Sequence, residues 1–60
     1  MYKVGQKVRV VDNSRTGHQF EIGEVVTVRT VTEEGDIDSC SGDDGDYWWV
    51  SDAEITPIIE

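Results

Sequence analysis

The fold of this chain is decided by the stretch Glu24-Val25-Val26-Thr27-Val28-Arg29-Thr30-Val31-Thr32. Most of its residues are β-branched, and β-branched side chains fit a pleated strand better than a helix. Side chains alternate along a strand, so Val26 and Val28 share one face. Val25 and Val31 lie on the opposite face. This change of face predicts a long strand that bends and serves two sheets of a barrel.

Shorter strands are predicted on both sides of this stretch. Apolar and basic residues alternate over residues 7–10, which predicts a half-buried strand. The aromatic run 47–50 predicts a second strand, and residues 36–41 predict a third with fewer apolar side chains. Residues 57–59 are expected to close the chain as an edge strand, where proline is tolerated. A single 3-10 turn with Ile55 as its apolar foot is expected just before them.

Turn-rich segments connect the predicted strands. Residues 33–36 and 42–46 are rich in acidic residues and glycine, and glycine supplies the positive φ that hairpins need. Both segments are therefore predicted to be the turns of consecutive antiparallel hairpins. The longer segment 13–23 contains the apolar residues Phe20 and Ile22, so we expect it to form a loop that folds back and packs.

Together these elements predict an all-β fold, a five-stranded SH3-like barrel with a long first loop and a 3-10 turn before the last strand. The chain length leaves room for one domain, which we expect to span residues 1–60. A domain of this size buries only about 60% of the surface of its unfolded chain, so its core must be assembled efficiently. The expected core residues are Val8, Val10, Val26, Val28, Ile37, Trp48, Val50 and Ile55.

The chain resembles small SH3-like barrel proteins encoded by tailed phages and prophages. The resemblance is carried by Val4-Gly5-Gln6-Lys7-Val8-Arg9-Val10, by residues 17–28, and by Asp46-Tyr47-Trp48-Trp49-Val50 with the segment that follows it. It covers nearly the whole chain and implies a small accessory protein of the host cytoplasm rather than an enzyme. KOW domains share the Gly-x-x-Val-x-Val start, but they are usually basic and this chain is acidic.

One departure from peptide-binding SH3 domains concerns the third predicted strand. In those domains a tryptophan begins this strand, and an aromatic-rich stretch elsewhere lines a groove for proline-rich ligands. Here the strand carries Asp36 and Asp38, and the tryptophans come one strand later. We therefore do not carry proline-rich recognition over to this chain.

The charge balance argues against several classes of partner. Thirteen acidic and five basic residues give a net charge of −8, so we expect neither direct binding of nucleic acid nor docking on anionic membranes. No apolar run approaches the ~20 residues of a membrane span, and the N-terminus does not resemble a signal peptide. The single cysteine cannot form an internal disulfide, which favours a cytoplasmic protein. The charge and the proline on the last strand also favour a monomer.

The strongest compositional feature is the acidic stretch 33–46, which contains no basic residue. It does not match a calcium-binding EF-hand loop, because Ser41 stands where glycine is needed and Tyr47 stands where glutamate is needed. Three interpretations remain open: solvated hairpin turns, a looser calcium site, and an electronegative face for a basic partner.

Tyr47, Trp48 and Trp49 form the other conspicuous group. On a strand, Trp48 shares a face with Val50, and Tyr47 shares the opposite face with Trp49. Because Trp48 lies on the side with apolar neighbours, we expect it in the core and the other two at least partly exposed. Exposed aromatic residues beside acidic ones suit a protein-binding surface, although they also serve simply to shield the outer face of small barrels.

The sequence therefore predicts a non-enzymatic protein-binding module that meets a protein partner through its aromatic face and acidic hairpins. The expected binding residues are Tyr47, Trp49, Asp43, Asp44, Phe20 and His18. The alternative is an acidic mimic of DNA that inhibits a nucleic-acid-binding protein through carboxylates at phosphate-like spacing.

Neither a cofactor nor a metal site is expected. His18 and Cys40 are each the single residue of their type and lie far apart in sequence, whereas zinc needs four ligands. We expect no enzymatic activity either, because no pair of groups has an evident reason for a shifted pKa in a shared pocket.

Overall fold

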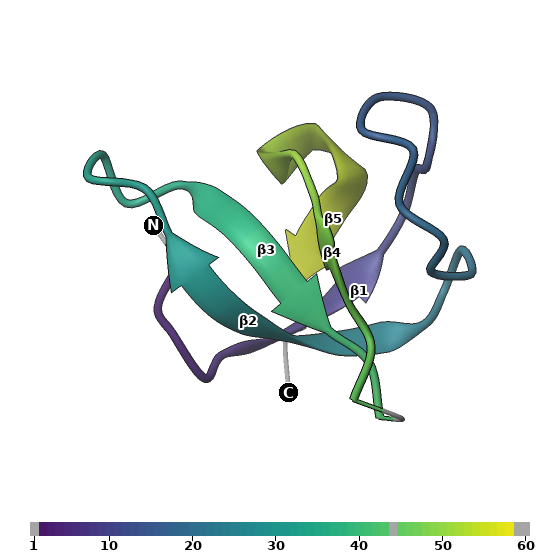
Figure 1. Ribbon diagram of the computed structural model, residues 1–60, viewed down its shortest axis with the longest axis horizontal. Helices are drawn as coiled ribbons and strands as arrows, with labels where there is room; N and C mark the ends of the chain where they lie inside the picture. Colours follow the sequence, from purple (N-terminus) through teal and green to yellow (C-terminus); the bar gives the residue numbers. More distant parts are fainter. Residues whose placement is uncertain (1, 44, 59–60) are drawn as a thin grey trace.

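The computed structural model describes residues 2–43 and 45–58, which form one antiparallel sheet and one turn of 3-10 helix (Figure 1). The elements in chain order are β1 (Lys7–Val10), β2 (Val25–Val31), β3 (Ile37–Ser41), β4 (Tyr47–Trp49), η1 (Asp52–Glu54) and β5 (Ile55–Pro57). The order of strands in the sheet is β4-β3-β2-β1-β5, so β4 and β5 are its edges. The predicted all-β fold, with five strands and a 3-10 turn before the last strand, is confirmed.

The strand β2 belongs to the single five-stranded sheet rather than to two sheets as predicted, and its pairing with β3 is irregular. Val26 and Val28 point into the core, where each is 1% exposed. The pairing of β2 with β3 shifts register between Val28 and Thr30 and again between Thr30 and Val31. These irregularities bring Val31 opposite the buried Ile37, and Val31 packs against the same core as Val28. The irregular pairing therefore turns Val31, which is three positions after Val28, to the same inner face.

The last strand begins two residues earlier than predicted. Ile55 follows η1 directly with an extended backbone, is buried, and pairs with Val10 of β1. Burial of this apolar side chain in the core sets the start of β5, whereas Pro57, the expected first residue, ends the strand opposite Val8. The edge position predicted for the proline-containing strand is confirmed. Residue 59 of the predicted strand lies outside the described residues.

The core lies on the concave side of the curled sheet, and all but one of the predicted core residues are buried in it. The exception is Trp48, which packs against the core but is only half-buried. Phe20 of the long loop and Cys40 of β3 complete the core. The buried hydrophobic residues are Val8, Val10, Phe20, Val26, Val28, Ile37, Cys40, Val50 and Ile55.

Tight turns join β2 to β3 and β3 to β4, as predicted. In the first turn Thr32 N–H donates to the Asp36 carbonyl (2.7 Å), and Gly35 has the positive φ, +88°, that favours glycine. In the second, Gly42 N–H donates to the Asp46 carbonyl (2.8 Å). The two turns lie at opposite ends of β3 (Figure 1). The acidic residues that are contiguous in sequence are therefore divided between two ends of the molecule.

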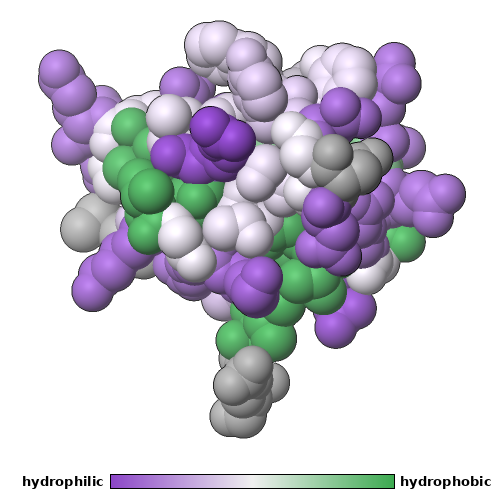
Figure 2. Space-filling view, turned by 60° about the horizontal axis from the view of Figure 1, so that its bottom comes forward, coloured by the Kyte–Doolittle hydropathy of each residue, from purple (hydrophilic) through white to green (hydrophobic). Residues whose placement is uncertain are grey.

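Exposed hydrophobic residues are scattered over the surface, and Figure 2 shows hydrophobic patches that hydrophilic residues separate. The large hydrophobic residues with the most exposed surface are Val4, Val11, Ile22, Tyr47 and Trp49. Among these, Tyr47 and Trp49 share one face of one strand, because they are two positions apart on β4. They pair with Ser41 and Ser39 of β3.

Candidate functional site

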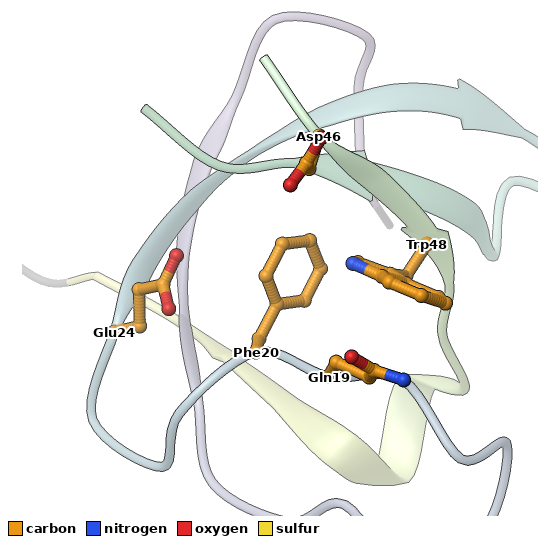
Figure 3. Close-up of a pocket in the computed structure, with 5 residues that line it drawn as sticks. All are labelled: Gln19, Phe20, Glu24, Asp46 and Trp48. Atoms are coloured by element: carbon orange, nitrogen blue, oxygen red, sulfur yellow. The ribbon is translucent and has the colours of Figure 1, made fainter. Parts of the chain in front are cut away.

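A small pocket lies between the long loop that follows β1 and the beginning of β4 (Figure 3). Its volume is about 140 Å³, and it is lined by Gln19, Phe20, Glu24, Asp46 and Trp48. In Figure 3 the Phe20 ring lies between Glu24 on one side and Trp48 on the other, with Asp46 above it. Two carboxylates that are distant in sequence therefore line one pocket together with two aromatic residues.

The position of Glu24 is set by the turn that ends the long loop. Gly23 has a φ of +92°, and its N–H donates to the Val10 carbonyl (2.7 Å). This left-handed turn leads into β2 and places Glu24 at the pocket. Glu24 Oε1 accepts from the Glu21 N–H (3.2 Å). Within residues 2–43 and 45–58, Glu24 forms no ion pair.

The long loop is anchored from inside by Glu54 of η1, which has no exposed surface. Glu54 Oε1 accepts from the Ser51 N–H (2.8 Å) and lies 2.6 Å from the Thr16 hydroxyl, which donates to it. Glu54 Oε2 accepts from the N–H groups of Arg15 and Thr16, at 3.3 Å each. The Glu54 carbonyl accepts from the Val11 N–H (2.8 Å). Glu54 therefore fixes the first part of the long loop at both of its ends, at Val11 and at residues 15–16.

Burial and hydrogen bonding act in opposite directions on the Glu54 carboxyl group. Burial raises its pKa, because the charged form loses its hydration. The hydrogen bonds from Thr16, Ser51 and Arg15 together outweigh burial and lower the pKa below the ordinary value of 4.5. At neutral pH Glu54 is thus a buried carboxylate whose charge the backbone of the loop stabilises.

His18 lies inside the loop and is 4% exposed. Its Nδ1 accepts from the Phe20 N–H (3.2 Å), which assigns the ring hydrogen to Nε2. Nε2 donates to the Asp12 carbonyl at 2.7 Å and lies 3.4 Å from Glu54 Oε2. The His18 side chain thus holds the loop together from within. It is absent from the exposed surface where we expected it, so we leave it out of the proposed binding surface.

The other predicted binding residues fall into two groups. Tyr47 and Trp49 are 60% and 66% exposed, and Asp43 is exposed beside them in the preceding turn. Phe20 is 5% exposed and contributes to the floor of the pocket rather than to the outer surface. Asp44 lies outside the described residues.

The basic side chains of the central strands gather on the outer face of the sheet and contact other parts of the protein. Lys7 Nζ lies 3.5 Å from the Thr27 hydroxyl, and Arg9 Nη1 donates to the Gly23 carbonyl (3.0 Å). The Arg29 guanidinium lies 5.4 Å from the centroid of the Tyr47 ring, a distance suited to a cation–π contact. Each of these three basic side chains therefore contacts another group of the protein.

Two further places in the protein hold titratable side chains with a shifted pKa. Asp36 lies beside Asp52, and a hydrogen bond to Asp52 and then its charge raise the pKa of Asp36. Cys40 is fully buried, and burial raises the pKa of its thiol to about 11, so it is a poor nucleophile. In the described part of the chain, no three His, Cys, Asp or Glu side chains are grouped to hold a metal ion.

Sequence reasoning missed Glu24 and Glu54. For Glu54 a signal was present, because Ser51 and Glu54 have the spacing of a capping box, and both of its hydrogen bonds form. For the pocket there was none: Glu24 and Asp46 are brought together only by the packing of the long loop against β4.

In comparisons with known proteins, no family model matches this chain, and no curated protein or solved structure is significantly similar to it. No helix within residues 2–43 and 45–58 has the length and apolar character needed to cross a membrane.

Proposed function

We propose that this chain is an SH3-like domain that acts as a non-enzymatic protein-binding module. The strand order, the long loop after β1 and the 3-10 helix before β5 support this fold. The resemblance to phage and prophage proteins supports an accessory role, performed as a monomer in the cytoplasm of the host.

The observation that carries the proposal is the exposure of two aromatic rings on one face of the edge strand β4. Tyr47 and Trp49, together with Asp43 in the turn before them, are here called the β4 surface. Large exposed aromatic residues next to polar ones are typical of binding hot spots, because they bury a large area at low cost in side-chain entropy. The Arg29 guanidinium covers part of Tyr47. Trp49 is therefore the principal anchor of the proposed contact.

The acidic charge supports a partner with a basic surface. A net charge of −8 on sixty residues attracts basic proteins and repels nucleic acids. Charges at the rim of an interface mainly accelerate encounter, whereas buried aromatic anchors slow dissociation. Asp43 and Trp49 are thus assigned separate kinetic roles.

The alternative, a mimic of DNA, has weaker support. Such a mimic needs carboxylates in an extended array on one face. Here the acidic residues of the two hairpin turns lie at opposite ends of β3 (Figure 1). We therefore propose the binding module.

The test uses the intact chain as bait in a lysate of the host cells, followed by kinetics with any captured protein. Trp49→Ala should increase the dissociation rate about tenfold or more. Asp43→Lys should slow association and reduce its dependence on salt. Val4→Ala is the matched control, because Val4 is equally exposed but lies outside β4.

The proposal fails if Trp49→Ala and Asp43→Lys bind every captured protein as the parent does. In that case the aromatic residues only shield the sheet. Loss of binding in Val4→Ala but not in Trp49→Ala would place the surface near the N-terminal turn.

A further inference from the structure

We infer that the pocket between the long loop and β4 binds the guanidinium group of an arginine side chain from the partner protein. This inference rests on the proposed function and adds to it the chemistry of one contact. The pocket is lined by Gln19, Phe20, Glu24, Asp46 and Trp48 and is distinct from the β4 surface.

The size of the pocket selects a single side chain. Pockets for drug-sized molecules usually have volumes of about 300–1,000 Å³, whereas this one has about 140 Å³. A pocket of this size accepts one side chain of a partner protein, which then serves as an anchor of the complex.

The charge of the pocket selects a cation. Among residues 2–43 and 45–58, the charged residues of the lining are Glu24 and Asp46, and both are acidic. Glu24 Oε1 accepts one backbone hydrogen bond, and a carboxylate has capacity for several more. An anionic ligand would be repelled, both by these two groups and by the net charge of −8.

The aromatic lining selects a planar, weakly hydrated cation over a metal ion. Trp48 is half-buried at one side of the pocket that Glu24 and Asp46 also line, and Phe20, which is 5% exposed, contributes to its floor (Figure 3). A guanidinium group stacks on aromatic rings and donates in a fork to carboxylates. Calcium takes six to eight oxygen ligands, and aromatic rings cannot supply them. Lysine carries a compact and strongly hydrated charge, which suits this lining less well.

The two tryptophans provide a built-in readout for the test. Trp48 lines the pocket and Trp49 does not, so the two indole N–H signals in an NMR spectrum report on the site and on a control position. The probe is arginine capped as Nα-acetyl-arginine methylamide, added at up to about 50 mM, the range for a weak single-residue ligand. Capped citrulline, which is neutral and nearly isosteric, is the control ligand.

We expect capped arginine to shift the Trp48 indole signal in a saturable manner and to leave the Trp49 signal unchanged. Capped citrulline should have no effect, and capped lysine should bind more weakly than capped arginine. Glu24→Gln and Asp46→Asn should each weaken binding about threefold or more. Glu33→Gln removes an exposed acidic residue outside both the pocket and the β4 surface and should have little effect.

Three results would overturn the inference. They are an unchanged Trp48 signal, an equal response to citrulline, and equal binding by Glu24→Gln and Glu33→Gln. The titration needs no partner protein, so its failure leaves the β4 surface and its Trp49 test intact. The opposite combination of results also separates the two proposals. If capped arginine binds saturably but no captured protein depends on Trp49 for binding, the pocket is supported and the β4 surface is rejected.

Discussion

Glu54 is a charged side chain without exposure to solvent, and such a group destabilises a fold unless hydrogen bonds replace its lost water. Here the replacement is supplied by Thr16, Arg15 and Ser51, two of which belong to the long loop. The long loop pairs with no strand along most of its length. Hydrogen bonds to the Glu54 carboxylate hold it in place instead. The loop that shapes the pocket owes its conformation to a residue almost forty positions away.

Substitution of this carboxylate should be costly. Glu54→Gln keeps the shape but places an amide NH₂ group against N–H donors, so we expect a loss of about 1–3 kcal/mol in the free energy of unfolding. A domain this small has only about 3–5 kcal/mol in total. Urea denaturation followed by tryptophan fluorescence measures the effect, with the exposed Glu33→Gln as control. Equal midpoints for the two variants would contradict the assigned role.

Stability should also depend on pH through Glu54. Its pKa in the folded protein is below the ordinary value of 4.5, so the folded state binds its proton less readily than the unfolded state. The resulting stabilisation is complete above pH ~4.5 and is lost as the pH falls through the folded pKa. Thermal unfolding between pH 3 and 7 should therefore show a steeper acid loss in the parent than in Glu54→Gln. Parallel pH profiles would exclude this linkage.

At the scale of elements, β4 divides two adjacent tryptophans between the inside and the outside. Trp48 lies opposite Cys40 and packs against the core, whereas Trp49 lies opposite Ser39 and is exposed. Trp48→Ala should lower the free energy of unfolding by about 2–3 kcal/mol, less than for a fully buried tryptophan. Trp49→Ala should change it by less than about 0.5 kcal/mol. Chemical denaturation of both variants tests the assignment, which the reverse order of stabilities would refute.

The alternation of side chains was enough to predict the elements and their faces. The β-branched run located β2, but alternation alone put Val31 on the face opposite Val28, whereas register shifts around Thr30 bring it to the core. The start of β5 was misplaced, because Pro57 was expected to be the first residue of the strand. Burial of Ile55 instead decides where the strand begins and how it pairs with β1. The pocket was not predictable, since it forms only where an irregular loop packs against β4. Local patterns contain no information on such long-range packing.

At the scale of the whole molecule, charge governs which partners approach. The outer face of the sheet carries Lys7, Arg9 and Arg29, but each of them contacts other groups of the protein. We therefore expect no binding to duplex or single-stranded DNA at about 150 mM salt. Fluorescence anisotropy with labelled oligonucleotides measures this, and micromolar affinity would show that these side chains form a cationic surface after all.

The pairing of β5 with β1 has a consequence for biosynthesis. Val10 must find Ile55 and Val8 must find Pro57, so one edge of β1 stays unpaired until β5 has been made. Glu54, which fixes the long loop, is also made late. Nascent chains that stop before Glu54 therefore lack both the closing strand and the clamp, and they should remain sensitive to proteases. Folding of this sheet is therefore expected to follow the synthesis of β5 rather than to accompany that of the earlier strands.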